Sequence, residues 1–188
     1  MRRLVLIALF AVLPLTGCGS AGGSGEPEAL VLAERAEPQS VDLGWRERYG
    51  DGARALHFEV ASLAVTADGW SARIAIENAT GIPFRLGAEP LTLTFGLMLF
   101  GNASMERFDD ANRAGALPAR RQAVTIVPEP PRRLEPGARW AATIAAPGAL
   151  PAGSFVRVVF GTLVAVGEPP GDMQPTIVWI TDHATRLR

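Results

Sequence analysis

The chain has 188 residues, a length that predicts one domain with an appendage and argues against two large domains. Its 18 basic residues are all arginine, and with 19 acidic residues they leave a formal net charge of -1, which excludes a generally basic nucleic-acid binder. The single cysteine excludes an intrachain disulfide framework and a zinc site built from several cysteines.

The first residues have the order of a secretory signal peptide. Residues 1–3 include two arginines, and residues 4–13 form an unbroken apolar run. This run is shorter than the ~20 residues that a membrane-spanning helix needs, so it indicates an export signal. It leads into Leu15-Thr16-Gly17-Cys18, a pattern that resembles the lipobox of bacterial lipoproteins.

The lipobox resemblance implies that residues 1–17 are removed by cleavage between Gly17 and Cys18, and that a lipid is attached to the Cys18 sulfur. Two or three acyl chains are enough for stable membrane attachment. Gly19 stands where an aspartate would retain such a lipoprotein in the inner membrane. The resemblance therefore favours the outer membrane where the organism has one, with the protein on the periplasmic or extracellular side. The alternative is an ordinary cleaved signal that leaves Cys18 as a free, buried thiol.

Residues 18–40 are expected to form a flexible tether. Residues 19–25 contain four glycines and two serines, a composition typical of a flexible coil. Residues 26–40 add four glutamates and two prolines, which favour a solvated segment, although residues 29–36 are also compatible with a short helix. The folded domain is then expected over residues 41–188.

From Val41 onward the dominant period of apolar residues is two, which is typical of strands. In the first clear strand the alternation slips between Val60 and Leu63, which predicts a bulge. Asp68-Gly69 predicts a hairpin, and Gly and Pro separate the later strands. The expected strands are 56–65, 70–77, 91–100, 124–127, 140–144, 155–166 and 176–181. This pattern predicts a single antiparallel all-β sandwich of seven to eight strands, with a closed barrel as the alternative.

A second resemblance rests on Arg133-Leu134-Glu135-Pro136-Gly137, followed by the alternating residues 140–144 and by Pro147-Gly148. Together with residues 76–80, this run is similar to the immunoglobulin-like accessory domains of bacterial envelope and secreted proteins. The resemblance implies an immunoglobulin-like sandwich without an intersheet disulfide. Together, the lipobox, the sandwich pattern and the absence of a catalytic motif predict a non-enzymatic module that binds or scaffolds another envelope component.

Residues 101–122 form the longest stretch without a strand pattern, and such stretches are often functional or partly helical. Arginines are frequent in and after this stretch, and a guanidinium binds phosphates and carboxylates bidentately. Candidate contacts for an anionic surface or envelope protein are Arg107, Arg113, Arg120, Arg121, Arg132 and Arg133. A solvated surface of mixed charge is the alternative interpretation.

The sequence contains two histidines, His57 and His183, both expected to be exposed. With Met98, Met105 and Met173 they have the donor chemistry of a Cu(I) site, so a periplasmic copper-binding protein is the alternative function. A hydrolase would need Asp109, Asp110 or His183 to converge in one cleft. No spacing favours either site, and we therefore predict a protein without catalytic residues, metal or cofactor, attached to the membrane through its N-terminal lipid.

Overall fold

The computed structural model describes residues 34–87 and 95–188. The signal peptide, the lipobox with Cys18, most of the expected tether and the first part of the strand expected at 91–100 lie outside these residues. Within the two described ranges, no helix has the length and apolar character that crossing a membrane requires.

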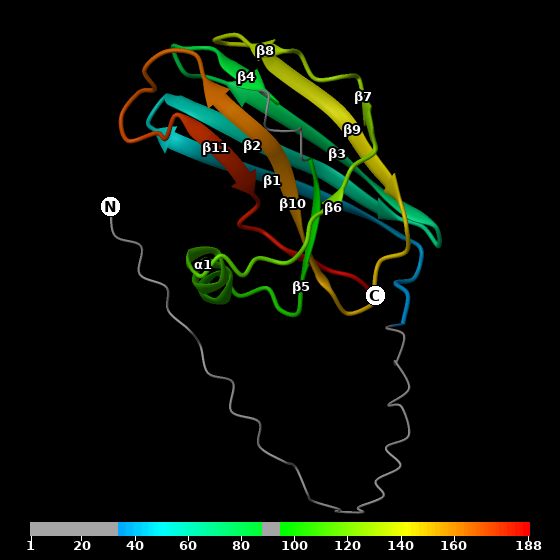
Figure 1. Cartoon of the computed structure of the whole chain (residues 1–188). Helices are drawn as coiled ribbons and strands as arrows, with labels where there is room; N and C mark the ends of the chain where they lie inside the picture. The colour runs from blue at the N-terminus through cyan, green and yellow to red at the C-terminus, as the bar shows by residue number, and fades with distance from the viewer. Residues whose placement is uncertain (1–33, 88–94) are drawn as a thin grey trace, which may run out of the picture. The chain divides into compact units, whose positions relative to one another are not determined.

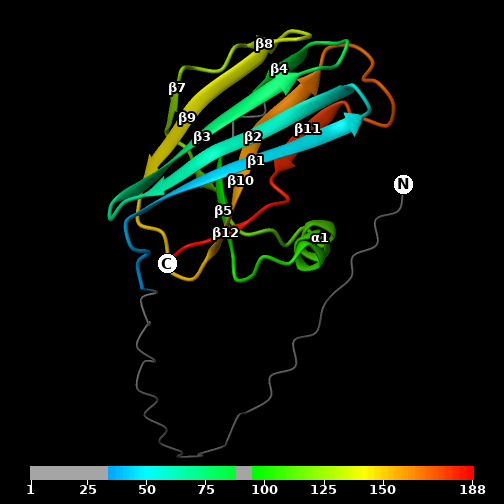
Figure 2. The same ribbon diagram turned by 180° about the vertical axis from the view of Figure 1, so that it is seen from behind.

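Two antiparallel sheets pack face to face, and Figures 1 and 2 show them from opposite sides. The first sheet has the order β1 (Gln39–Asp51), β2 (Arg54–Val65), β3 (Gly69–Asn78), β9 (Arg139–Pro147) and β7 (Thr125–Val127). The second has the order β6 (Arg121–Gln122), β5 (Gly96–Phe100), β10 (Phe155–Ala165), β4 (Phe84–Leu86) and β8 (Arg133–Leu134), with β11 (Thr176–Ile180) and β12 (Thr185–Arg186) also paired with β10.

The predicted all-β sandwich is confirmed, and the closed barrel is not formed. The described residues contain twelve strands, more than the seven or eight expected. The strands that were not expected are the long β1 and four strands of only two or three residues, β4, β6, β8 and β12. Such short strands leave no alternation in the sequence.

The strand β1 pairs with β2 from end to end, with one register shift between Asp42 and Trp45. The folded part begins before the boundary expected at Val41. Arg35 already forms an antiparallel bridge with Pro151, and the Ala36 side chain is buried in the core. The start of the domain escaped prediction because residues 34–38 are rich in acidic residues and proline yet are held by these contacts.

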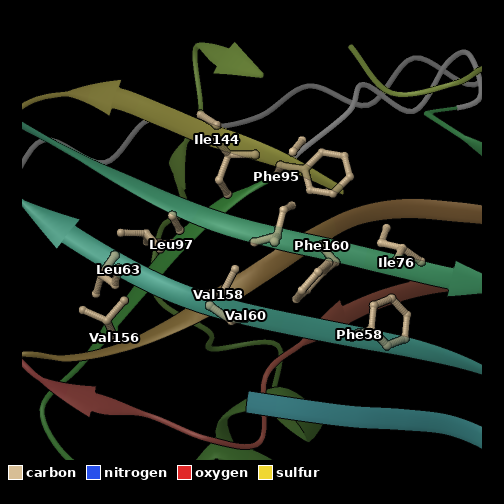
Figure 3. Close-up of a cluster of buried hydrophobic side chains, with 14 of the residues drawn as sticks. Phe58, Val60, Leu63, Ile76, Phe95, Leu97, Ile144, Val156, Val158 and Phe160 are labelled. Atoms are coloured by element: carbon tan, nitrogen blue, oxygen red, sulfur yellow. The ribbon is translucent and has the colours of Figure 1, made fainter. Parts of the chain in front are cut away.

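The hairpin of β2 and β3 follows the sequence pattern closely. The predicted bulge is confirmed as a register shift between Val60 and Ser62. The predicted hairpin turn is confirmed by the Thr66 amide, which donates a hydrogen bond of 2.8 Å to the Gly69 carbonyl. Figure 3 shows how side chains from both sheets meet in the core. The labelled residues of the first sheet are Phe58, Val60, Leu63, Ile76 and Ile144. Those of the second sheet are Leu97, Val156, Val158 and Phe160, and Phe95 immediately precedes β5.

The buried amide of Asn78 ends β3 and joins the two sheets at one corner. Its Nδ2 donates to the carbonyls of Ile82 (2.8 Å) and Leu134 (3.0 Å), and its Oδ1 accepts from the Thr80 hydroxyl (2.6 Å). Because Leu134 belongs to β8, the same side chain also positions a strand of the second sheet.

Residues 101–122 contain one helix, α1 (Met105–Arg113). The Ser104 hydroxyl caps the helix by accepting from the Arg107 amide (3.3 Å). Only Phe108 of the helix is buried, so the sequence shows no apolar period from which the helix could be recognised. Figures 1 and 2 both show α1 outside the two sheets.

Candidate functional site

The side chain of Arg157, in the middle of β10, is completely buried. Its Nη1 donates to the Thr181 carbonyl at 2.7 Å and also to the Asp182 carbonyl. Its Nη2 donates to the Ala103 carbonyl at 3.1 Å. These acceptors belong to the segment after β11 and to the segment before α1, so one guanidinium joins both to the centre of the second sheet.

Two aromatic rings complete the surroundings of the guanidinium. Its carbon lies 4.8 Å from the ring centre of Phe108 and 5.6 Å from that of Phe100, distances suited to a cation–π interaction. Burial lowers the pKa of Arg157, while the carboxylates of Asp182, Glu47 and Asp109 act in the opposite direction. Arg157 thus holds α1 in two ways, through the hydrogen bond to the Ala103 carbonyl before the helix and through the contact with Phe108.

A second buried charge, Glu47 of β1, lies across the sandwich from Arg157's strand. Its side chain is only 4% exposed. One carboxylate oxygen accepts from the Trp179 indole nitrogen at 2.7 Å. The other accepts from the His183 backbone amide at 3.0 Å and lies 2.7 Å from His183 Nδ1. Glu47 therefore connects the first sheet to β11 and to the segment that follows it.

The imidazole of His183 is held in one orientation by its neighbours, although the side chain is 56% exposed. Its exposure was expected, whereas its contact with Glu47 was not. The Trp45 ring stacks on the imidazole with 5.6 Å between ring centres and an interplanar angle of 22°. A neutral imidazole that donates from Nδ1 has Nε2 as its acceptor nitrogen. This carboxylate–histidine pair is an arrangement that orients histidines in metal and catalytic sites.

A groove of about 390 Å³ lies between α1 and β11, beside this polar cluster. Its apolar lining comes from Met98, Phe108, Leu117, Val178, Trp179 and Ile180, and its polar lining from Asn112, Arg120 and Asp182. Because Trp179 lines the groove and also donates to Glu47, the groove and the buried cluster share a wall.

The pKa of Asp182 is raised, first by burial and then by the neighbouring carboxylate of Glu47, with a smaller contribution from Asp109. Arg157 and His183 oppose this rise. The negative charge of Glu47 therefore acts on the end of the groove at Asp182.

Another hollow, of about 340 Å³, lies on the outer face of the first sheet. It is floored by small side chains such as Ala75 and Ala141. Its central carboxylate, Glu59, is already paired with Arg139 at 2.9 Å and with Arg46 at 3.7 Å. The groove between α1 and β11 is the better candidate site because the carboxylate in its lining, Asp182, forms no ion pair with another described residue.

The six arginines expected to contact an anionic partner do not gather on one surface. Arg107 and Arg113 lie on α1, Arg120 and Arg121 at β6, and Arg132 and Arg133 at β8. The strands β6 and β8 stand at opposite ends of the strand order of the second sheet. Arg113 is paired with Asp110 (2.5 Å) and Arg133 with Glu135 (2.9 Å). Contact with an anionic partner stays a prediction.

The expected copper donors are also distributed. Met98 is buried in the lining of the groove, whereas the buried Met173 lines a different hollow, beside Tyr49. His57 is half-buried on the outer face of the first sheet. Among the residues that the structure describes, no group of three His, Cys, Asp or Glu side chains is arranged to hold a metal ion. The copper site likewise stays a prediction.

Sequence reasoning missed Glu47, Arg157, Trp179 and Asp182. Of these, only Arg157 could have been recognised from the sequence. It interrupts the apolar run 155–166, and a charged residue in a buried strand needs partners. Comparisons with protein-family models, curated proteins and solved structures found no match to this chain.

We expect Arg157→Met to loosen α1 while the sheets stay folded, because the Ala103 carbonyl before the helix loses its donor and Phe108 loses the guanidinium. In the full-length chain, hydrogen exchange of the amides of residues 105–113 should accelerate about tenfold or more. Exchange in β2 and β3 should change little. The matched control is Arg139→Met, which removes an exposed guanidinium. Unchanged protection of α1 in Arg157→Met would show that the guanidinium does not hold the helix.

Stability should also depend on the Asp182 carboxyl. Because its pKa is raised above 3.8 in the folded protein, the folded state binds this proton more tightly than the unfolded chain. The resulting stabilisation is lost as the pH rises above 3.8. Urea unfolding from pH 4 upward should therefore show a smaller loss of stability in Asp182→Asn than in the unaltered chain. Asp51→Asn, which removes a negative charge elsewhere, should follow the unaltered chain.

Proposed function

We propose that this protein is a lipid-anchored, non-enzymatic binding module of the bacterial cell envelope, and that it binds another envelope component in the groove between α1 and β11. The observation that supports the proposal most directly is the preformed groove itself. Its volume and its apolar lining with a few polar groups are typical of ligand sites. The lipobox pattern ending in Cys18 supports the anchored location.

The walls of the groove are suited to binding because both are held from behind. Trp179 stacks in parallel on the core residue Phe58 at 5.1 Å, and Phe108 packs against Arg157. Preorganised walls lower the entropic cost of association. The buried Glu47 supports the same interpretation, because its oxygens are engaged in holding Trp179 and His183. An envelope protein that exposes a side chain to this groove is the kind of partner we expect.

The anchor is tested by labelling the expressing cells with radioactive palmitate. The full chain should incorporate label, and Cys18→Ala should incorporate none, because the sequence offers no second cysteine. Ser20→Ala is the matched control and should keep the label. Label retained in Cys18→Ala would overturn the lipid anchor.

The groove is tested by placing a photo-cross-linking amino acid at Val178, which lines it and is 43% exposed. The control position is Val124, which is 70% exposed and lies next to β7 at the edge of the first sheet. In intact cells, Val178 should form a discrete cross-linked product and Val124 should not. Products from Val124 alone would place the interaction elsewhere and overturn the assignment of the groove.

A further inference from the structure

The groove between α1 and β11 has a lining that limits what can occupy it. Most of the lining is apolar, and Val178 is one of the few large apolar side chains that stay exposed in the described residues. The charged side chains of the lining are Arg120 and Asp182. The charges that act most on Asp182 are those of Glu47, Arg157, His183 and Asp109.

The carboxylate of Asp182 has no partner of its own in the described residues. Glu47 is engaged with Trp179 and His183, and the guanidinium of Arg157 with backbone carbonyls. The Asp182 carboxylate forms no hydrogen bond or ion pair with another described residue. A cation bound in the groove would give this carboxylate a partner.

We propose that the groove binds a lysine side chain of an envelope partner protein, with the alkyl stem between Phe108 and Val178 and the ammonium group at Asp182. This inference rests on the proposed function and names the chemistry of its partner. An unbranched apolar stem suits the lining, and Phe108 and Trp179 offer aromatic faces to the cation. The ammonium of lysine is a compact charge on a flexible four-carbon stem, so it can reach a single carboxylate at the end of an apolar groove.

The composition of the chain adds a constraint on the source of this side chain. The chain has no lysine, since all its basic residues are arginine. The occupant therefore belongs to a different molecule, and a second copy of this chain is excluded as the donor of a lysine.

The test measures binding of three probe peptides to the full-length chain in detergent by titration calorimetry. The probes are acetyl-Leu-Lys-Leu-amide, its glutamine analogue and its arginine analogue. The lysine peptide should bind about tenfold more tightly than the glutamine peptide, as expected for a partly desolvated charge pair. Equal binding of the lysine and glutamine peptides would overturn the proposal. Tighter binding of the arginine peptide would overturn the assignment to lysine.

Two variants locate the binding. Asp182→Asn should abolish the preference for lysine, while Asp172→Asn, an exposed acid beside a different hollow, should keep it. Val178→Arg should block all three peptides because the larger side chain fills the groove. Its positive charge also repels the lysine and arginine peptides. It is chosen because an exposed position tolerates the change even if Asp182→Asn unfolds. Lysine preference retained in both groove variants would contradict the site.

The outcome separates this inference from the proposed function. Cross-linking from Val178 without any lysine preference would reject the lysine while leaving the groove as the binding site. Absence of both would reject the groove altogether.

Discussion

The arrangement of the candidate site depends on one buried guanidinium. Arg157 is buried on the face of β10 opposite to the core residues Val156 and Val158, where an unpaired charge is also costly. Its partners are three backbone carbonyls and two phenylalanine rings. These acceptors are at the ends of secondary-structure elements, where carbonyls are not consumed by the ladders. A nine-residue helix that buries only Phe108 is marginal by itself. The guanidinium thus determines where α1 lies and, with it, one wall of the groove.

The opposite wall depends on Glu47 in an analogous way. Its carboxylate links β1 of the first sheet to Trp179 and His183 of the second. Arg157 and Glu47 are complementary in sign and act on the same short segment, residues 179–183, from two sides. The two buried charges therefore serve geometry more than stability, because a buried polar network specifies one arrangement of its neighbours.

The parts of the fold that could be predicted are those in which local pattern and long-range packing agree. The strands β2 and β3, their bulge and their turn all follow from alternation over residues 56–77 and from Asp68-Gly69. The helix α1 could not be predicted, since it is short and buries only one of its nine residues, Phe108. Nor could the site, because Glu47 and His183 are 136 residues apart. The position of Arg157 in an apolar run indicates a buried charge. Its acceptors could not be predicted, because they are backbone carbonyls, which every residue has.

The pairing of β1 has a mechanical consequence if the N-terminus is held by the proposed lipid anchor. The described chain joins the folded part at Arg35 and Ala36 and continues into β1, which pairs with β2 along its length apart from one register shift. Tension applied along the axis of β1 stretches the hydrogen bonds of this ladder side by side, in shear. Bonds loaded in this geometry share the force, whereas bonds at the end of a peeled hairpin open one after another. Under the proposed anchor, this ladder resists a pull that begins at the membrane.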